Sequence, residues 1–434
     1  MRLYVTIYEN TADEAIARIR SLDADHDGVE VRAERHPGLD LRALRAATAK
    51  PLILTHRGMS VDEATIQRAI DAGIELVDVE WRPDLDRAMV ERHRERIIVS
   101  HHDYHHLDHV EQIVADMRGL GCAETKLAAT PETFADNERL LRLIDSHTSV
   151  VGMGERGLYA RLLAPFRGSP LTFVAVSSIA APGQLTLERA LAIYGDGRES
   201  LRAEKVFAIA GNPAGHSLSP SIHNRLFREK GLPGAYTIAS FETFDEIAQP
   251  FLRGEPAGLS VTAPFKEEAF VFAQSISAEL GANASACGAV NTLVNVNGRI
   301  LADNTDVDGF AAILKGVGAT PRKIAIVGAG GTARAALAAA RGRDVTVYNR
   351  TPGKLGARPL DELRDFDGDV LIDTVPEHVD LPLRAGMTYI RASYGTYAAN
   401  IERAQNAGAA VIDGLALLNA QALRQHELFL QVFA

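Results

Sequence analysis

Short runs rich in β-branched residues recur over the first half of the chain, with helical segments between them. There are eight such runs: LYVTIY, GVEVRAE, PLILTHRG, LVDVEW, RIIVSHHDY, ETKLAAT, SVVGMG and LTFVAV. Strands that alternate with amphipathic helices pair in parallel through crossover connections. Eight units of this kind close into a (β/α)8 barrel, whose catalytic groups lie at the carboxyl ends of the strands. The first half therefore predicts a barrel with a site at that rim.

A polar stretch separates this region from a second α/β region. It is YGDGRESLRAEK, residues 194–205, and the apolar strand run VFAIAGNP follows it. We predict a barrel over residues 1–195, a substrate-binding lobe over 206–305 that residues 415–434 complete, and a dinucleotide-binding lobe over 306–414. The expected fold class is α/β: a barrel fused to a two-lobed dehydrogenase with a Rossmann-type domain.

Composition excludes several classes of function. Hydrophobic residues at 46% and charged residues at 24% are typical of a globular protein that stays in water. The net charge of −10 is scattered, and without a Lys/Arg cluster we expect no nucleic-acid partner. Cys122 and Cys287 lack the spacing of a disulfide framework or a zinc site, so we expect a reducing cytoplasm and no metal. No run has the length of a membrane span, and the opening MRLYVTIYEN reads as a strand, not as a secretion signal.

The segment RKIAIVGAGGTARAALAAA contains a strand, a glycine turn and an alanine-rich helix in direct succession. Gly328, Gly330 and Ala333 match the G-x-G-x-x-G/A fingerprint in the context that it needs. The first glycine permits a tight turn, the second lets the backbone approach a pyrophosphate, and the small third residue lets helix and strand pack closely. The expected cofactor contacts are Gly328, Ala329, Gly330, Gly331, Thr332 and Ala333.

The next strand, VTVYNR, indicates which dinucleotide binds. It ends in Asn349 and Arg350, where an enzyme that uses NAD carries an acid for the ribose 2′-hydroxyl. An arginine suits a 2′-phosphate instead, and Thr351 and Lys354 add a donor and a second cation. We therefore predict NADP, with Gly414 as a further candidate contact.

Two further motifs suggest a reductase site. In GNPAGHSLSPSIHN, Ser217 and Ser219 precede a helix, so their hydroxyls and the positive helix end could hold a carboxylate, although serines in such turns are mostly helix caps. Lys266 follows the buried strand of GLSVTAPFK, and Asp306 begins a helix in ADNTDVDGF. A lysine beside an aspartate can donate a proton to a ketone oxygen as hydride arrives.

Together, GHSLSPSIHN, SVTAPFK, GAVNT, NTDVDGF, GAGGTARA and NRT resemble the shikimate dehydrogenase family over about residues 206–430. The resemblance implies that Ser217 and Ser219 bind the substrate carboxylate and that Lys266 and Asp306 form the catalytic pair. It implies further substrate contacts from Thr262, Asn291, Tyr394 and Gln421. Two departures are Ser260, where the family usually has Asn, and RASYGTY, which lacks the usual D-x-x-Y-x-P wording.

The barrel carries a second set of candidate residues. Lys126 lies in the sixth strand, and Ser100 and His102 alternate in the fifth, so these two should face one side and His101 the other. Burial and a neighbouring cation would lower the pKa of Lys126, leaving a free amine that can form an imine with a ketone. The ordinary alternative is a lysine that extends from the rim into water.

SHHDY, ETKLAAT and AAPGQ resemble the S-x-H-D-F, strand-six lysine and S-A-P-G-Q motifs of type I 3-dehydroquinate dehydratases, over residues 1 to about 192. The resemblance implies that Lys126 forms a Schiff base with the ketone of 3-dehydroquinate. His102 would then remove the proton next to the imine and help the β-hydroxyl leave as water. The implied substrate contacts are Glu30, Arg32, Arg57, Arg161 and Gln184, with Arg161 best suited to bidentate carboxylate binding.

This region also departs from the family. Ala180 replaces the serine of S-A-P-G-Q, and Tyr104 replaces phenylalanine. The loop after Arg57 is short, and for the acid that family members place there the candidate is Glu63.

The combined hypothesis is a bifunctional enzyme of the shikimate pathway, a lyase and an NADP-dependent oxidoreductase, in which the barrel makes 3-dehydroshikimate and the second half reduces it to shikimate. The alternatives are an aldolase barrel joined to a quinate reductase, a quinate/shikimate dehydrogenase with a drifted barrel, and a ligand-sensing regulator derived from these domains. The expected partners are the small-molecule substrates, and the oligomeric state stays open between monomer and homodimer.

Overall fold

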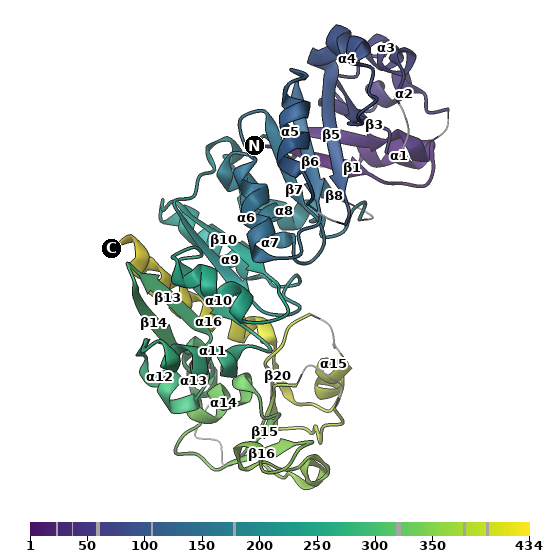
Figure 1. Ribbon diagram of the computed structural model, residues 1–434. Coiled ribbons are helices and arrows are strands. Elements are labelled where there is room, and N and C mark those ends of the chain that lie inside the picture. Colours follow the sequence, from purple (N-terminus) through teal and green to yellow (C-terminus); the bar gives the residue numbers. More distant parts are fainter. Residues whose placement is uncertain are drawn as a thin grey trace. The chain divides into compact units, whose positions relative to one another are not determined.

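The computed structural model describes residues 1–22, 25–36, 38–57, 61–105, 107–176, 179–317, 323–375, 379–395 and 399–434 (Figure 1). Contacts between residues divide the chain into two compact units. The first unit contains Met1–Ile209 and Pro213–Glu242, and the second contains Ala210–Asn212 and Thr243–Ala434.

The first unit contains the predicted barrel. Each of the eight predicted runs forms a strand: β1 (Arg2–Ile7), β2 (Gly28–Arg32), β3 (Leu52–Thr55), β4 (Leu76–Glu80), β5 (Ile97–Asp103), β6 (Glu124–Ala129), β7 (Thr148–Gly152) and β8 (Leu171–Ala175). All neighbouring pairs are parallel, in the order β7-β6-β5-β4-β3-β2-β1-β8. The α/β barrel that the alternating pattern predicted is therefore confirmed.

Helices follow the strands and lie outside them, as Figure 1 shows for α3 to α6. They are α1 (Ala12–Arg20), α2 (Leu41–Ala46), α3 (Glu63–Asp71), α4 (Arg87–His93), α5 (Val110–Arg118), α6 (Phe134–Arg142), α7 (Leu158–Leu163) and α8 (Leu187–Tyr194). Thr11 and Thr133 begin α1 and α6 with capping boxes, which satisfy main-chain donors that a helix start leaves free.

Serine side chains join the two end strands of the ladder, β7 and β8. Ser149 Oγ accepts a hydrogen bond from Leu171 N at 2.9 Å, and Ser169 Oγ accepts one from Val150 N at 3.4 Å. Both serines are buried, so these hydroxyls satisfy main-chain donors that a strand pairing would otherwise use. Side-chain hydrogen bonds thus bridge the seam of the barrel.

The first unit continues beyond the barrel with β9 (Lys205–Ala210), α9 (Ser219–Glu229) and β10 (Gly234–Ala239). The helix α7 packs on β10, and α8 packs on α9. Thr237 Oγ1 donates to Tyr159 O at 3.0 Å, and Arg228 donates to Ile193 O, so the segment after the barrel is fixed to its last two helices.

The second unit begins with α10 (Asp245–Leu252) and a set of strands in the order β11-β13-β14-β12. These strands are β11 (Gly258–Val261), β12 (Glu279–Leu280), β13 (Thr292–Val296) and β14 (Arg299–Asp303). Three helices accompany them: α11 (Lys266–Ser275), α12 (Ala282–Cys287) and α13 (Thr305–Gly316).

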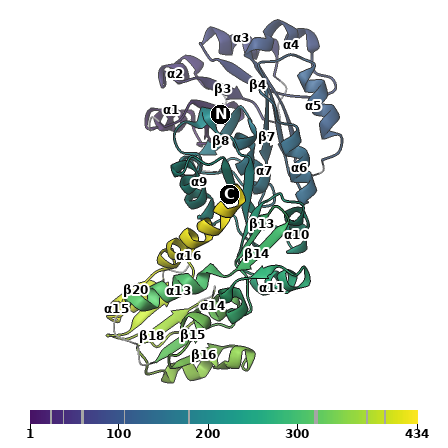
Figure 2. The ribbon, with the colours of Figure 1, turned by 90° about the vertical axis from the view of Figure 1, so that its left-hand side faces the viewer.

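A parallel sheet in the order β17-β16-β15-β18-β19-β20 follows in the same unit. Figure 2 shows its strands beside α13 and α14. The chain passes from β15–β16 on one side to β18 on the other side of β15, and ligands of open α/β sheets bind at such a switch point. The elements are β15 (Ile324–Val327), α14 (Gly331–Ala339), β16 (Val345–Asn349), β17 (Arg358–Pro359), β18 (Val370–Asp373), β19 (Thr388–Arg391), α15 (Ala399–Asn406), β20 (Ala410–Ile412) and α16 (Gly414–Phe429).

No helix in the described part of the chain is long and apolar enough to span a membrane.

Candidate active sites

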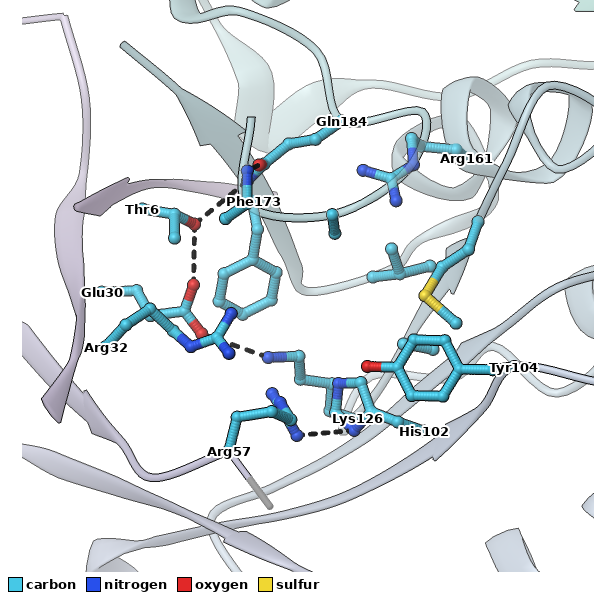
Figure 3. A pocket seen from close by; sticks show the side chains of 15 residues that line it. Thr6, Glu30, Arg32, Arg57, His102, Tyr104, Lys126, Arg161, Phe173 and Gln184 are labelled. Carbon is cyan, nitrogen blue, oxygen red and sulfur yellow. Dashed lines mark hydrogen bonds and ion pairs between the residues drawn. The ribbon is translucent and has the colours of Figure 1, made fainter. Parts of the chain in front are cut away.

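The carboxyl ends of the barrel strands surround a pocket (Figure 3). The space that these residues enclose, including the open solvent at its mouth, is about 540 Å³. Every substrate-contact or catalytic residue predicted for the barrel lines it: Glu30, Arg32, Arg57, His102, Lys126, Arg161 and Gln184. The remaining lining residues are Thr6, Tyr104, Ala128, Val151, Met153, Phe173, Ala180 and Ala181.

Lys126 is buried in the middle of one layer of the barrel interior. Its Nζ lies 3.0 Å from Asp78 Oδ2, 3.4 Å from Glu30 Oε1 and 4.0 Å from the centroid of the Phe173 ring. These four side chains come from β2, β4, β6 and β8, and alternate strands of a (β/α)8 barrel contribute the side chains of one layer. The sequence predicted a buried lysine with a cation nearby; the structure adds two carboxylates in direct contact with its amine.

The two carboxylates stay ionised at neutral pH. Burial alone would raise the pKa of Asp78, but Lys126 and Arg57 stabilise the charged form and hold this pKa below its ordinary value. Burial likewise opposes ionisation of Glu30, and Lys126 and Arg32 lower its pKa. A positive charge at the Lys126 nitrogen therefore has two anionic partners inside a buried layer.

His102 is neutral in this pocket. Its Nδ1 lies 2.9 Å from Glu80 Oε2 and 2.6 Å from Arg57 Nη1, and its main-chain N donates to Glu80 Oε1 at 2.9 Å. Burial lowers the pKa of His102 to about 4, and the hydrogen bond that the ring donates to the Glu80 carboxylate, which favours the charged ring, offsets this only in part. A neutral imidazole can accept a proton at pH 7.

Strand alternation places the β5 side chains as predicted. Ser100 is buried and donates from Oγ to Asp78 Oδ1 at 2.5 Å, on the same side as His102. His101 packs edge-on against Trp81 at 5.8 Å between ring centroids.

Asp78 and Glu80 are not among the residues predicted from the sequence. Glu63 is exposed on α3, where it pairs with Arg92 at 2.7 Å and with His93 at 3.2 Å. The acid beside His102 is Glu80, at the end of β4. The period of two in LVDVEW was an available signal, because it sends Asp78 and Glu80 to the same face of the strand. The loop after Arg57, residues 58–60, lies outside the described residues.

Arg161 is the buried cation on the far side of the pocket. Its Nε donates to Gly152 O at 2.7 Å and its Nη2 to Pro182 O at 3.2 Å. Burial lowers its pKa to about 10, and both of these partners in the described part of the chain are main-chain carbonyl oxygens, not carboxylates. A buried cation without an anionic partner suits an anionic ligand.

The loop after β8 carries the first departure from the family motif. Ala180 lines the pocket, and its main-chain N donates to Gln184 Oε1 at 2.8 Å. Gln184 Nε2 donates to Thr6 Oγ1 at 3.1 Å, and Thr6 Oγ1 donates to Glu30 Oε2 at 2.7 Å. The loop is thereby connected to the layer that holds Lys126 (Figure 3). Tyr104, the other departure, also lines the pocket.

The predicted carboxylate-binding serines lie in the first unit. Ser217 and Ser219 are both buried, and Ser219 begins α9 with Pro220 in its first turn. Ser219 N donates to Ser217 Oγ at 3.2 Å, so the two predicted residues belong to one tight turn.

The predicted catalytic pair of the reductase lies in the second unit and is in direct contact. Lys266 Nζ is 2.6 Å from Asp306 Oδ2 and 3.1 Å from Thr332 Oγ1. Asn304 starts α13 as its cap, accepting from Asp306 N at 3.2 Å, which fixes the Asp306 main chain. The lysine therefore contacts both its predicted partner and a residue of the predicted cofactor turn.

A buried polar network surrounds two predicted substrate contacts in this unit. Asn291 Oδ1 accepts from Thr305 N at 2.8 Å, and Thr305 Oγ1 donates to Gln421 Oε1 at 3.1 Å. Ser260, the departure from the family's Asn, donates to Gln425 Oε1 at 2.5 Å. Thr262 and Tyr394 are half-buried, and residues 396–398 lie outside the described residues.

The glycine turn after β15 fits a dinucleotide pyrophosphate. Gly328 has φ of +108°, which side chains other than glycine rarely adopt. A Cβ on Gly331 would lie 2.6 Å from Lys266 Cβ, so a glycine lets Lys266 approach the helix start. Ala333 is fully buried, as close packing of helix on strand requires.

The residues predicted to recognise a 2′-phosphate follow β16. Asn349 Nδ2 donates to Thr351 O at 3.1 Å, which bends the chain after the strand. Arg350 is exposed, and Lys354 Nζ lies 3.1 Å from Glu267 Oε1. Gly414 begins α16, whose cap is Asp413. Among the described residues no group of His, Cys, Asp or Glu could hold a metal ion.

Comparison with known proteins assigns two parts of the chain to families. Residues 3–197 match the type I 3-dehydroquinase family, and residues 209–293 match the shikimate dehydrogenase substrate-binding domain. The shikimate biosynthesis protein AroDE of Chlamydia pneumoniae is 30% identical over 365 residues, which cover 78% of this chain and 74% of that protein. The chloroplastic bifunctional 3-dehydroquinate dehydratase/shikimate dehydrogenase of Arabidopsis thaliana is 28% identical, covering 93% of this chain and 77% of that protein.

The chain is also 33% identical, over 79% of its length, to the pentafunctional AROM polypeptide of Eremothecium gossypii, and it spans 23% of that polypeptide. The fold and the two family matches define the class of protein: this chain is an enzyme that joins a barrel lyase to an α/β oxidoreductase. The chain belongs to the family of bifunctional type I 3-dehydroquinate dehydratase/shikimate dehydrogenases of the shikimate pathway.

Proposed function

We propose that this protein catalyses two consecutive steps, the dehydration of 3-dehydroquinate to 3-dehydroshikimate and the reduction of 3-dehydroshikimate to shikimate with NADPH. The first activity belongs to residues 1–195 and the second to residues 206–434, with lobes over 206–305 plus 415–434 and over 306–414. The observation that carries the proposal is the buried Lys126 in a pocket with a neutral His102 and two ionised carboxylates.

In the dehydratase step, the Lys126 amine attacks the ketone carbon of 3-dehydroquinate, and loss of water gives a protonated imine. Asp78 and Glu30, in contact with the lysine nitrogen, stabilise this cation. The neutral His102 removes a proton from the carbon next to the imine, and the electron pair moves to the imine nitrogen as an enamine. The enamine then expels the β-hydroxyl, which takes a proton from His102 and leaves as water. Hydrolysis of the imine releases 3-dehydroshikimate and restores the amine.

The surrounding side chains orient the substrate. Arg161 binds the carboxylate, because it is a buried cation whose guanidinium otherwise contacts only carbonyl oxygens among the described residues. In the neutral ring of His102, Nδ1 carries the proton and donates it to the Glu80 carboxylate. The other ring nitrogen, Nε2, is then free to accept the proton from the substrate and to return it. The residues assigned to the ring hydroxyls are Glu30, Arg32, Arg57 and Gln184.

In the reductase step, bound NADPH supplies hydride to the ketone carbon. Lys266, ion-paired with Asp306, holds the proton that the ketone oxygen receives. The substrate contacts are Ser217 and Ser219 for the carboxylate and Thr262, Asn291, Tyr394 and Gln421 for the ring. The cofactor contacts are Gly328, Ala329, Gly330, Gly331, Thr332 and Ala333 for the pyrophosphate, Asn349, Arg350, Thr351 and Lys354 for the 2′-phosphate, and Gly414.

A pair of single substitutions tests this division. Lys126→Ala removes the imine nitrogen, so dehydration is lost and shikimate oxidation with NADP stays within about twofold of wild type. Lys266→Ala gives the reverse pattern, because the proton donor of the second site is lost. Loss of both activities in either variant would contradict two independent sites.

A further inference from the structure

One turn of the barrel reaches both its own pocket and the segment that carries the two serines. The turn connects β7 to α7 and comprises residues 153–157. Gly154 N donates to Pro182 O at 3.2 Å, in the loop that also supplies Ala180 and Gln184 to the pocket. The next residue, Glu155, points the other way, toward residues 213–219 of the same compact unit.

Glu155 holds the main chain just before the serines. Its Oε1 accepts hydrogen bonds from Ala214 N at 3.0 Å and from Gly215 N at 2.5 Å. A Cβ on Gly215 would lie 2.3 Å from Glu155 Oε2, so a glycine is what allows the carboxylate to come this close. Ala214 O accepts from Ser217 N at 2.9 Å, so the turn that Glu155 holds is the one that ends at Ser217.

A second barrel residue holds the other end of the turn. Arg189, on α8, donates from Nη2 to Ser217 O at 3.0 Å. The segment is thus fixed at residues 214–215 by a barrel anion and at Ser217 by a barrel cation. Neither Glu155 nor Arg189 is among the substrate contacts assigned above.

We propose that Glu155 is a positioning residue for the reductase: a carboxylate supplied by the barrel orders the turn that presents Ser217 and Ser219 to the carboxylate of shikimate. The inference rests on the proposed function, because it takes those serines as the carboxylate site. The reductase half of the chain therefore depends on the barrel for substrate affinity as well as for substrate supply.

The two hydrogen bonds to Glu155 act by ordering the turn at residues 214–217. Hydrogen bonds from main-chain N–H groups to a carboxylate are stronger than those to a neutral acceptor, and two of them fix one short segment. Without them the turn samples more conformations, and substrate binding must then supply the cost of ordering it. This cost falls on binding of the substrate carboxylate, whereas Lys266 and Asp306 keep their own contacts.

Steady-state oxidation of shikimate by the full chain tests the inference. In Glu155→Ala the KM for shikimate rises roughly 3- to 10-fold, because substrate binding must then order the turn, while kcat and the KM for NADP change less than about twofold. Glu155→Gln keeps one acceptor oxygen and gives an intermediate KM. Glu242→Gln is the matched control: it removes a neighbouring carboxylate, which pairs with Arg156 at 2.5 Å, and leaves all three parameters unchanged.

The possible results distinguish a failure of the role of Glu155 from a failure of the proposed shikimate dehydrogenase activity. Dehydratase activity measured on the same preparations reports whether each variant is folded. If the wild type does not oxidise shikimate, the proposed function itself fails. If the wild type is active but Glu155→Ala keeps the wild-type KM, or loses kcat and NADP affinity to the same extent, Glu155 does not position the serine turn.

Discussion

The titration of His102 is the sharpest physical prediction of the barrel site. With a pKa of about 4, the imidazole is roughly 90% neutral at pH 5, whereas an ordinary histidine with a pKa of about 6.5 is roughly 3% neutral. The difference corresponds to about 3 kcal/mol in favour of the neutral ring in the folded protein. Because the folded-state pKa is the lower one, protonation of His102 favours the unfolded chain. The contribution of His102 to the free energy of unfolding is therefore fully present above pH 6.5 and is lost as the pH falls toward 4.

Two substitutions should move this pKa in opposite directions. Glu80→Gln removes the partner that favours the charged ring, so the pKa of His102 falls further. Arg57→Ala removes a cation 2.6 Å from Nδ1, so the pKa rises toward its ordinary value. Both variants also lose dehydratase activity, since each of these side chains contacts the catalytic imidazole.

Nitrogen NMR of the imidazole rings between about pH 2.5 and pH 8, a range that extends below the expected midpoint, measures the effect directly. The resonance of His102 is identified by its absence from the spectrum of His102→Gln. The reasoning is refuted if the wild-type ring titrates near pH 6.5, or if Glu80→Gln and Arg57→Ala shift the midpoint in the same direction.

Three further predictions concern the second unit. Gly331→Ala introduces a Cβ 2.6 Å from Lys266 Cβ, so shikimate oxidation falls at least about tenfold while dehydration, assayed in parallel, is unchanged. Arg350→Ala removes a predicted contact of the 2′-phosphate and raises the KM for NADP roughly tenfold without affecting the KM for NAD; an equal rise for both cofactors would count against that contact. Asp373→Asn breaks the buried ion pair with Arg391, 2.8 Å apart, and destabilises this unit by about 3–5 kcal/mol, measurable as a lowered thermal transition; an unchanged transition would mean that the pair contributes little.

The periodicity of the sequence was sufficient for the barrel. Apolar runs of strand length at regular spacing predicted all eight strands, and alternation within β5 correctly put Ser100 and His102 on one side. Local motifs likewise indicated the glycine turn and the contact between Lys266 and Asp306, because the residues of each motif are close in sequence or belong to a recognisable family pattern.

The contacts between side chains of different strands could not be predicted from the sequence, because they depend on which strands face each other across the barrel. Glu30, Asp78 and Lys126 meet because β2, β4 and β6 contribute to one layer, and that layering follows from the strand stagger of the closed barrel. The run LVDVEW shows that Asp78 and Glu80 share a face, but it does not show that Asp78 meets Lys126 of a distant strand. The contact of Glu155 with Ala214 was not predicted either, since it depends on the packing of a later segment against the turn after β7.

The central claim is that one chain converts 3-dehydroquinate to shikimate through an imine on Lys126. The most direct test is to add 3-dehydroquinate and NADPH to the purified protein, follow the absorbance of the reduced cofactor, and trap the imine with borohydride for mass analysis. We predict that the cofactor is consumed and that a reduced adduct forms on Lys126. Oxidation of shikimate with NADP, but neither turnover of 3-dehydroquinate nor an adduct on Lys126, would show that the barrel no longer performs the first step.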